Sequence, residues 1–265
     1  MKSRIPAVIL SVLLVSGILA ACSGGNSQIK DIQERGVLRA GVKVDVPRFG
    51  YLNPDTGEME GLEVDLARAI AKDILGDENA VKFTNITAQT RGAMLDNGEI
   101  DIVVATFTIT DERKDLYNFS RPYYTDELGY LVRSSSSIEH PEDLDGKSAG
   151  VLQASTSKPA FEAECERLGI SVDLREYTSY PEVKAALNSG EVDAFITDKS
   201  ILFGYLDAEC AMLEEGFNPQ NYGVACKLGY DKLAARIDAL VDALEKNGGL
   251  ADIMVKWGLA GGAAG

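Results

Sequence analysis

Histidine is almost absent from this chain, since His140 is the only one among 265 residues. A Ser-His-Asp mechanism would have to pass through that residue, but it stands just before Pro141, a position typical of the start of a helix. A zinc site is not expected, because the cysteines lack the spacing of a finger or a ribbon. The scarcity of these side chains argues against hydrolytic and metal chemistry, and we expect neither a metal nor a cofactor.

Positive charge is scarce as well. The chain has 26 lysines and arginines against 41 acidic residues, which gives a formal net charge of −15. Nucleic acid is therefore not expected as a partner, because its phosphates attract basic surfaces. No Gly-x-Gly-x-x-Gly or phosphate-loop pattern follows a predicted strand, so nothing supports nucleotide binding.

No apolar run is long enough to span a bilayer, and the longest candidate, residues 7–19, is too short. Lys2 and Arg4 precede this run, and small residues follow it in the sequence Leu19-Ala20-Ala21-Cys22. The pattern predicts a secretory signal with a lipoprotein-type cleavage site before Cys22. An ordinary signal peptide with an incidental cysteine is the alternative.

Cleavage would remove residues 1–21 with two positive charges, so the net charge would change from −15 to −17. Residues 22–30 are then predicted to form a lipidated polar tether. The protein is expected outside the cytoplasm, anchored by lipid to the cell membrane, on the cell surface or the periplasmic face. The remaining cysteines permit one disulfide and one free thiol, and the sequence does not select the pair among Cys165, Cys210 and Cys226.

Short apolar strands alternate with amphipathic helices along the rest of the chain. Leu62, Leu66, Ile70 and Ile74 recur at four-residue spacing and predict a helix that begins after Gly61. The alternation is typical of an α/β fold, and about 240 residues suffice for two lobes of roughly 100 residues each. Further strands are predicted over 37–43, 148–152, 172–176 and up to Thr197, and further helices over 156–168, from Pro181 and over 231–247.

The chain also repeats itself. Residues 93–101 (AMLDNGEID) return 92 positions later as residues 185–193 (AALNSGEVD). Each copy is predicted to be a helix end, a glycine stop and an apolar strand. The same offset pairs Thr106 with Asp198 at equivalent strand ends. Because ligands of open α/β sheets bind outside the carboxyl ends of the strands, two such lobes facing each other would form a cleft there.

The segment 106–113 (TFTITDER) places hydroxyl groups and an arginine between a strand and a helix. Residues 101–105 are predicted to be the buried strand, and Thr110 is predicted to cap the helix. Backbone N–H groups, the helix dipole and Arg113 would then converge on one carboxylate. A polar loop with a surface arginine is the alternative.

Two stretches are predicted to connect the lobes, residues 128–133 and residues 222–227. If both cross the boundary, the first lobe is discontinuous. The predicted domains are then 31–129 for the first part of lobe 1, 130–223 for lobe 2 and 224–265 for the completion of lobe 1, joined by a two-strand hinge.

Five segments carry a resemblance to a known family: 37–42 (VLRAGV), 61–67 (GLEVDLA), 108–113 (TITDER), 119–124 (FSRPYY) and 192–198 (VDAFITD). Nearly the whole mature chain resembles the amino-acid-binding family of extracellular solute-binding proteins, the receptors of ABC-type importers. The resemblance implies a periplasmic-binding-protein-like fold, in which each lobe is a mixed, mostly parallel sheet flanked by helices, and the two lobes close around one amino acid. It also implies permease subunits in the membrane as partners, and a monomer is expected.

Within that family, the position of Arg113 holds the α-carboxylate of the ligand. Residues at the positions of Thr108 and Thr156 assist it, and Ser155 lies beside the latter at the predicted helix start. The position of Asp198 takes the α-ammonium, with Thr106 nearby. These roles agree with physics, because a buried charge needs an opposite charge or charge-assisted donors.

Specificity departs from the broad family pattern. Family members for neutral or cationic ligands commonly stack aromatic rings at the positions of Val46 and Ala88, and both rings are missing here. Receptors for cationic ligands carry an acid at the position of Lys43, which reverses the charge offered to the ligand side chain. The chain resembles the aspartate/glutamate-binding branch at Arg91, which stands at a helix start, and at its neighbouring segments 95–98 (LDNG) and 105–110 (ATFTIT). Lys43, Arg91 and Arg113 against Asp198 would leave the site near +2, which suits an acidic amino acid. Tyr180 is a further candidate for the cleft wall.

Three other functions stay open at this point. A receptor for glutamine or another neutral amino acid would keep the same α-amino-acid clamp. A dehydratase-like enzyme could use the same fold, although the scarcity of histidine argues against it, and the chain is not expected to be an enzyme. A surface adhesin or the ligand-binding subunit of a sensor is the third.

Overall fold

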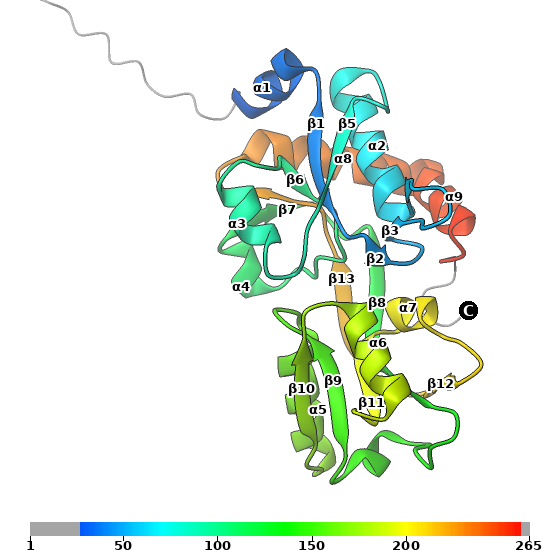
Figure 1. Ribbon diagram of the computed structural model, residues 1–265. Coiled ribbons are helices and arrows are strands. Elements are labelled where there is room, and N and C mark those ends of the chain that lie inside the picture. Colours follow the sequence, from blue (N-terminus) through cyan, green and yellow to red (C-terminus); the bar gives the residue numbers. More distant parts are fainter. Residues whose placement is uncertain (1–26, 261–265) are drawn as a thin grey trace, which may run out of the picture.

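Two separate β-sheets divide residues 27–260, the part of the chain that the computed structural model describes, into two lobes (Figure 1). The sheet of lobe 1 has the order β5-β1-β6-β14-β7, and that of lobe 2 has the order β10-β9-β11-β8-β12. The strands of lobe 1 are β1 (Leu38–Val42), β5 (Val81–Asn85), β6 (Ile102–Val103), β7 (Tyr117–Phe119) and β14 (Ala225–Lys227). The strands of lobe 2 are β8 (Tyr124–Arg133), β9 (Ser148–Leu152), β10 (Asp173–Tyr177), β11 (Ala194–Asp198) and β12 (Cys210–Met212).

Both sheets are mixed, and each has a parallel half. Strand β1 runs parallel to β5 and β6, and β9 runs parallel to β10 and β11. The remaining neighbours, including β14 beside β6 and β8 beside β11, are antiparallel. The parallel halves bring the carboxyl ends of β1 and β6 in one lobe, and of β9 and β11 in the other, to the facing edges of the lobes (Figure 1).

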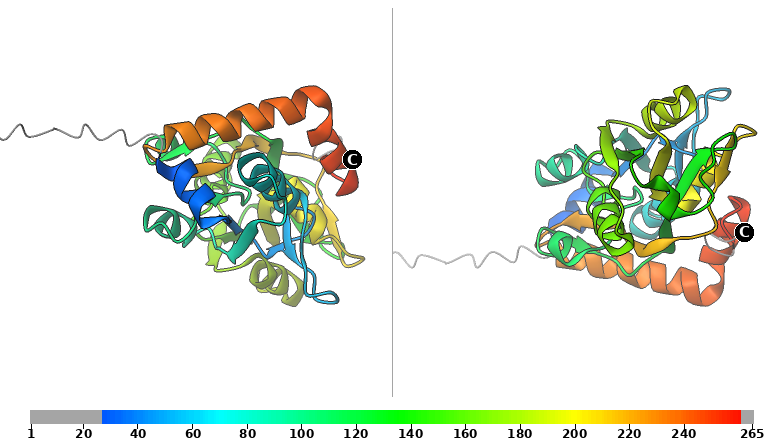
Figure 2. Two further views of the ribbon diagram at one scale, coloured as in Figure 1. Left: turned by 90° about the horizontal axis from the view of Figure 1, so that it is seen from above. Right: turned by 90° about the horizontal axis from the view of Figure 1, so that it is seen from below.

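Helices cover both faces of each sheet. In lobe 1, α2 and α8 pack on one face and α3 packs on the other, as contacts with β1, β14 and β6 show. Figure 2 shows α8 running along one side of this lobe. The helices of lobe 1 are α1 (Ser27–Arg35), α2 (Leu62–Leu75), α3 (Arg91–Asp96), α4 (Asp111–Lys114), α8 (Asp231–Asn247) and α9 (Gly249–Lys256). Those of lobe 2 are the 3-10 turn η1 (Pro141–Leu144), α5 (Ser157–Leu168), α6 (Tyr180–Ser189) and α7 (Lys199–Gly204).

Several predicted elements are confirmed almost to the residue. The helix expected over 231–247 is α8, and the apolar stripe from Leu62 to Ile74 is the buried face of α2. The strand expected over 148–152 is β9, and Thr110 caps α4 by accepting a hydrogen bond from the backbone N–H of Arg113 at 3.2 Å. Within residues 27–260, no helix has the length and apolar character that a membrane crossing requires.

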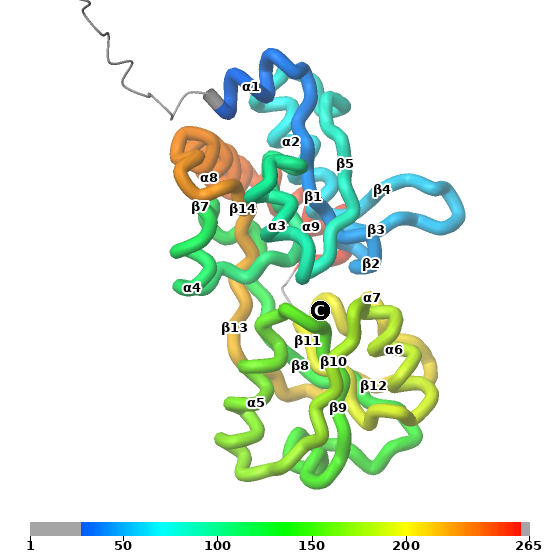
Figure 3. Tube along the Cα trace, turned by 60° about the vertical axis from the view of Figure 1, so that its left-hand side comes forward, coloured from blue at the N-terminus to red at the C-terminus, as the bar shows by residue number. Residues whose placement is uncertain are grey.

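Two antiparallel strands join the lobes. Strand β8 begins at Tyr124, and its first five residues pair with β13 (Phe217–Tyr222), so that the two run side by side between the lobes (Figures 1 and 3). From Leu128 onward β8 also pairs with β11 of lobe 2. The predicted crossing at residues 128–133 and the boundary at 129/130 therefore fall inside a strand of lobe 2. The chain leaves lobe 1 after Tyr124, whose ring packs on Phe49 of lobe 1, and enters the sheet of lobe 2 at Leu128.

The start of the described chain also differs from the prediction. Helix α1 begins at Ser27, so residues 27–30 are helical and do not belong to a tether. The reason is the position of Ile32, which is 1% exposed and packs into the core of lobe 1, with Ile29 beside it. The predicted signal peptide, Cys22 and the rest of the tether lie outside the described residues.

The internal repeat is a repeat of backbone geometry. Gly98 and Gly190 both have positive φ, 70° and 79°, a conformation that favours glycine. The N–H of Glu99 donates to the carbonyl of Met94 at 2.9 Å, and the N–H of Glu191 donates to that of Ala186 at 2.9 Å. The two copies thus end a helix in the same way and start β6 and β11 at equivalent points.

The reactive side chains named from the sequence lie away from any shared site. Cys165, Cys210 and Cys226 are all free thiols, so no pair among them forms a disulfide. His140 precedes the turn η1, as predicted, and its Nδ1 lies 2.7 Å from the Glu215 carboxylate on the surface.

Candidate ligand-binding site

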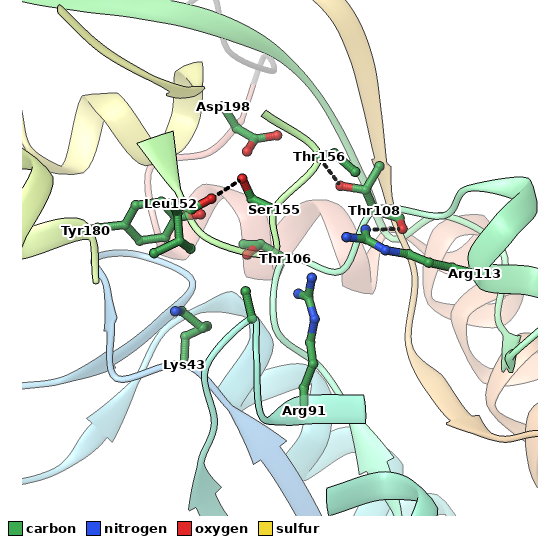
Figure 4. A pocket seen from close by; sticks show the side chains of 11 residues that line it. Lys43, Arg91, Thr106, Thr108, Arg113, Leu152, Ser155, Thr156, Tyr180 and Asp198 are labelled. Atoms are coloured by element: carbon green, nitrogen blue, oxygen red, sulfur yellow. Dashed lines mark hydrogen bonds between the residues drawn. The ribbon is translucent and has the colours of Figure 1, made fainter. Parts of the chain in front are cut away.

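One cavity between the lobes brings together all nine residues that the sequence proposed for a ligand site. The space between these residues is about 320 Å³, including the part that is open to solvent. Figure 4 shows the side chains converging on this space from both lobes. The lining residues are Lys43, Arg91, Thr106, Thr108, Arg113, Ser155, Thr156, Tyr180 and Asp198, with Ala88 and Leu152 in addition.

Arg113 stands at one end of the cavity, on the short helix α4. Its guanidinium donates to the Thr108 carbonyl at 2.8 Å, and it has no carboxylate within ion-pair distance among the described residues. Burial lowers the pKa of Arg113 to about 10, so the side chain remains charged at neutral pH. A buried cation with unused donors is a site for a carboxylate.

Arg91 is a second buried cation and the first residue of α3. Only 6% of it is exposed, and its single hydrogen bond is a donation to the Ala105 carbonyl at 3.3 Å. Burial first, and then repulsion from Arg113, lower the pKa of Arg91 to about 9. This guanidinium also lacks a carboxylate at ion-pair distance among residues 27–260, although Glu63 attracts it from farther away, as Asp198 attracts Arg113.

Lys43 follows β1 and differs from the arginines in having a partner. Its Nζ lies 3.1 Å from the Asp45 carboxylate and 5.1 Å from the centre of the Tyr180 ring. Asp45 begins β2 (Asp45–Val46), which forms a small sheet with β3 (Gly50–Leu52) and β4 (Met59–Glu60). The predicted site charge near +2 is therefore too high, because Asp45 compensates one of the three cations.

Asp198 supplies the negative charge of the cavity at the end of β11. It is 5% exposed, and its Oδ1 has no hydrogen-bond partner among the described residues. Its Oδ2 accepts a hydrogen bond from the Thr197 hydroxyl at 3.3 Å. Burial, reinforced by the neighbouring Asp126, raises the pKa of Asp198 to about 7. An unpaired buried carboxylate of this kind is stabilised by a cation, and no side chain within residues 27–260 forms an ion pair with it.

Thr106 occupies the equivalent position in the lobe 1 repeat, in a conformation that costs energy. Its φ is +41°, which is unfavourable for a β-branched residue. Its backbone N–H donates to the carboxylate of Glu63, which is fully buried on α2 and also accepts from the Tyr123 hydroxyl at 2.5 Å. Glu63 thus holds Thr106 at the cavity wall, and burial raises the pKa of Glu63 to about 7.

Hydroxyl groups complete the carboxylate end of the cavity. Thr108 of lobe 1 and Thr156, which precedes α5 of lobe 2, both donate to the side-chain oxygen of Gln220, each at 2.8 Å. Ser155 donates to the Leu152 carbonyl at 2.7 Å and faces the same space (Figure 4). Gln220 lies on β13, so a strand of the hinge connects the hydroxyl groups of both lobes.

Tyr180 and Val46 resolve two open points from the sequence. Tyr180 begins α6, is 4% exposed, and packs against Phe195 and Tyr205 while its ring faces Lys43. Val46 is fully buried in the core and does not line the cavity. Of the two positions where related receptors stack aromatic rings, only Ala88 therefore borders the cavity, and it leaves that side open.

Contacts across the mouth show that the lobes are closed. The Arg48 guanidinium lies 4.1 Å from the centre of the Phe203 ring on α7. The hydroxyl of Tyr205 in lobe 2 donates to the Asp45 carbonyl in lobe 1, and Gln89 of lobe 1 bonds to Gln153 of lobe 2. These contacts join lobe 1 to lobe 2 at points outside the paired hinge strands.

The arrangement fits a zwitterion. Arg113 offers free donors for one carboxylate, Asp198 offers an acceptor for an ammonium, and Arg91 remains for a further anionic or oxygen-bearing group. A carboxylate and an ammonium on one small molecule would thus satisfy charged groups in both lobes at once.

Some residues that matter to the site were missed by the sequence analysis. Glu63 lies in a segment that carried the family resemblance, and its acidic side chain inside an apolar helix face was a usable signal. Asp126 on β8 and Gln220 on β13 gave no such signal, because their roles depend on the pairing of the two hinge strands. Phe107, under the two arginines, looked like an ordinary core residue.

The comparisons with known proteins agree with this geometry. Residues 38–260 match the model of the bacterial extracellular solute-binding proteins, family 3. The chain is 36% identical to the ABC transporter glutamine-binding protein GlnH of Bacillus subtilis (strain 168), over 97% of each chain. It is 31% identical to the glutamate-binding protein GluB of Corynebacterium glutamicum, over 93% of this chain and 87% of that one.

A solved structure gives the same result for the fold. The cysteine-binding protein from Campylobacter jejuni superimposes with a TM-score of 0.79 at 30% identity, over 86% of this chain and 91% of that one. The predicted two-lobed, periplasmic-binding-protein-like fold is therefore confirmed. Two lobes joined by paired strands, a cavity built for a zwitterion and the match over residues 38–260 together show that the chain belongs to family 3 of the bacterial extracellular solute-binding proteins, the amino-acid receptors of ABC importers.

Proposed function

We propose that this receptor captures an acidic amino acid, glutamate or aspartate, by closing its two lobes around it, and delivers it to an ABC permease. The α-carboxylate binds Arg113, and the hydroxyls of Thr108, Thr156 and Ser155 join it by rotating their protons away from Gln220 and Leu152. The α-ammonium binds Asp198 beside Thr106. The side-chain carboxylate binds Arg91, with Lys43 and Tyr180 at the same end. Affinity near micromolar, about −8 kcal/mol, would allow both capture and release.

The observation that carries this proposal is the balance of unpaired charge. Arg91 and Arg113 have no carboxylate partner among residues 27–260, whereas Asp198 is the one unpaired acid that borders the cavity. A ligand with two carboxylates and one ammonium compensates all three groups. A ligand with one carboxylate leaves the buried Arg91 with neutral acceptors alone, which costs electrostatic energy.

Glutamine is the second candidate, and two observations favour it. The B. subtilis relative is named for glutamine, and Asp45 compensates Lys43, which lowers the positive charge of the side-chain end. In this alternative, Arg91 donates to the amide oxygen of the ligand. The comparison of glutamate with glutamine therefore decides between the two.

Binding without turnover is part of the proposal. The lining contains a serine, but its hydroxyl donates to a backbone carbonyl, and no base lies beside it in the described chain. Activation of a nucleophile requires such a base. A dehydratase-like activity and an adhesin or sensor role remain alternatives that a binding assay separates.

Lipid anchoring is also proposed, from the sequence alone. Cys22 follows a short apolar run and small residues, the pattern of a lipoprotein signal. Mass spectrometry of the membrane fraction would find a diacylglycerol-modified Cys22, and Cys22→Ser would release the protein from cells.

Thermal unfolding of the ligand-stripped protein against single amino acids tests the proposed ligand. A specific ligand at 100 times its dissociation constant adds about 2.7 kcal/mol, or roughly 5–10 °C for a chain of this size. We expect a shift with glutamate and aspartate only. A shift with glutamine instead would overturn the acidic assignment, and no shift with any amino acid would favour the enzyme or adhesin alternatives.

A further inference from the structure

Two arginines of the cavity share one aromatic ring. The guanidinium carbon of Arg91 lies 3.8 Å from the centre of the Phe107 ring, and that of Arg113 lies 4.6 Å from the same centre. The ring is 3% exposed and does not line the cavity. Phe107 therefore contacts both cations from beneath while the ligand space lies beyond them.

The Phe107 ring stabilises the positive charge of these two arginines, which form no ion pair within residues 27–260. Two buried guanidinium groups repel each other, and the repulsion contributes to the lowered pKa of Arg91. The face of an aromatic ring carries partial negative charge and attracts a cation placed over it. A guanidinium stacked on a ring keeps the N–H donors at its edge free, so both arginines can still bind carboxylates in their own planes.

The ring is itself fixed by its surroundings. It packs against Phe119 at 5.1 Å and Tyr117 at 5.8 Å, measured between ring centres. Its backbone carbonyl accepts a hydrogen bond from the N–H of Gly223 at 3.1 Å, so the residue is tied to the segment that links β13 and β14. A ring held in this way can hold the two cations at a set separation.

The two arginines depend on the ring to different degrees. Arg113 also donates to the Thr108 carbonyl at 2.8 Å, whereas Arg91 is closer to the ring and makes only a longer hydrogen bond of 3.3 Å. Removal of the aromatic face should therefore disturb Arg91 more than Arg113. Arg91, which is proposed to bind the side-chain carboxylate of the ligand, would lose its position first.

We propose that Phe107 is a positioning residue that holds Arg91 beside Arg113 and thereby sets the preference for ligands with two carboxylates. This inference rests on the proposed acidic ligand. Phe107 is 3% exposed and does not line the cavity. Part of the ligand specificity is therefore assigned to a buried residue behind the cavity wall.

The test compares Phe107→Leu with Phe161→Leu, which removes a buried ring of lobe 2 that packs on Tyr130 and Phe217 and contacts neither Phe107 nor a guanidinium. Dissociation constants for glutamate, aspartate and glutamine would be measured by calorimetry on ligand-stripped protein. We expect Phe107→Leu to weaken glutamate and aspartate binding at least tenfold and glutamine binding less than threefold. Phe161→Leu should leave the ratio of glutamate to glutamine affinity unchanged, and Phe107→Tyr, which keeps the aromatic face, should restore it.

A pentafluorophenylalanine at position 107 provides a second test that preserves shape. Fluorination reverses the charge of the ring face, so glutamate binding should weaken as in Phe107→Leu even if the leucine variant fails to fold. Equal loss for all ligands, or an unchanged ratio in both variants, would overturn the role of Phe107. A wild-type protein that prefers glutamine would instead refute the acidic ligand, and the two failures are therefore distinguishable.

Discussion

The two walls of the cavity carry opposite charge. Lobe 1 contributes Lys43, Arg91 and Arg113, whereas lobe 2 contributes Asp198 with the hydroxyls of Ser155 and Thr156. Neither wall alone compensates its own buried charge. A zwitterionic ligand compensates both walls only when the lobes are closed, so the difference between the lobes links binding to closure.

The difference is notable because the two lobes share a backbone repeat. Gly98 and Gly190 end equivalent helices with the same hydrogen bonds, and the following strands lead to Thr106 and Asp198 at the cavity. One position carries a neutral hydroxyl and the other a carboxylate. The repeat thus fixes where side chains meet the ligand, and single residues decide the charge that each lobe presents.

The strongest way to break the contrast is to neutralise lobe 2 with Asp198→Asn. The ammonium of every amino acid would lose its buried carboxylate, so affinity should fall about 1,000-fold, or ~4 kcal/mol, whatever the ligand side chain. Calorimetric titration with glutamate, aspartate and glutamine measures this. Retention of tight binding for any of them would contradict the assignment of Asp198.

Removing one positive charge from lobe 1 should instead weaken the binding of acidic ligands more than the binding of glutamine. Arg91→Ala is expected to weaken glutamate and aspartate binding about 100-fold, or ~2.7 kcal/mol, with little effect on glutamine. Arg167→Ala is a matched control, since Arg167 pairs with Glu164 on the exposed face of α5. Unchanged glutamate affinity in Arg91→Ala would refute its role at the side chain of the ligand.

One buried acid in each lobe determines how the stability of the unliganded protein changes with pH. Asp198 and Glu63 have folded pKa values of about 7, above the unfolded values near 4, so between these pH values the folded state holds protons that the unfolded state has released. Both groups therefore make the free energy of unfolding decrease as pH rises from about 4 to about 7.

Asp198→Asn should remove part of this decrease and stabilise the unliganded protein by about 2 kcal/mol at pH 8. Urea unfolding of both proteins at pH 5 and pH 8 measures the difference. If the variant were no more stable than wild type at pH 8, burial of an unpaired Asp198 charge would be refuted.

The smallest expected effect comes from a contact between the lobes that does not involve the ligand. Arg48→Ala removes the guanidinium that stacks on Phe203 across the mouth, and with it about 0.5–1 kcal/mol of the closed state. All ligands should then bind about two- to fivefold more weakly, because the competent closed form is less populated. A change confined to acidic ligands would show that Arg48 acts on the cavity itself.

Much of this site could be predicted because its parts are local in sequence. The cap at Thr110 follows from capping chemistry, and the strand ends at Thr106 and Asp198 follow from periodicity and the internal repeat. Arg91, Lys43 and Thr156 came from the family resemblance, and the structure brings all nine proposed residues to one cavity. The α8 bounds were equally local, because Gly248 follows the helix with positive φ.

What the sequence analysis missed depends on long-range contacts. The predicted boundary at 129/130 falls inside β8, which continues through it to pair with β11, and no local pattern indicated this pairing. The pairing of Lys43 with Asp45 requires a particular turn after β1. The hydrogen bond from the Thr106 N–H to the Glu63 carboxylate joins residues 43 positions apart. The stacking of two arginines on Phe107 is likewise a product of packing.

The most direct measurement is competition between glutamate and glutamine for the ligand-stripped wild-type protein, followed by calorimetry. The account predicts glutamate binding near micromolar and glutamine binding at least 30-fold weaker, about 2 kcal/mol, because only glutamate compensates both Arg91 and Arg113. Glutamine binding as tight as or tighter than glutamate binding would contradict the central claim that two unpaired cations in lobe 1 select a second carboxylate.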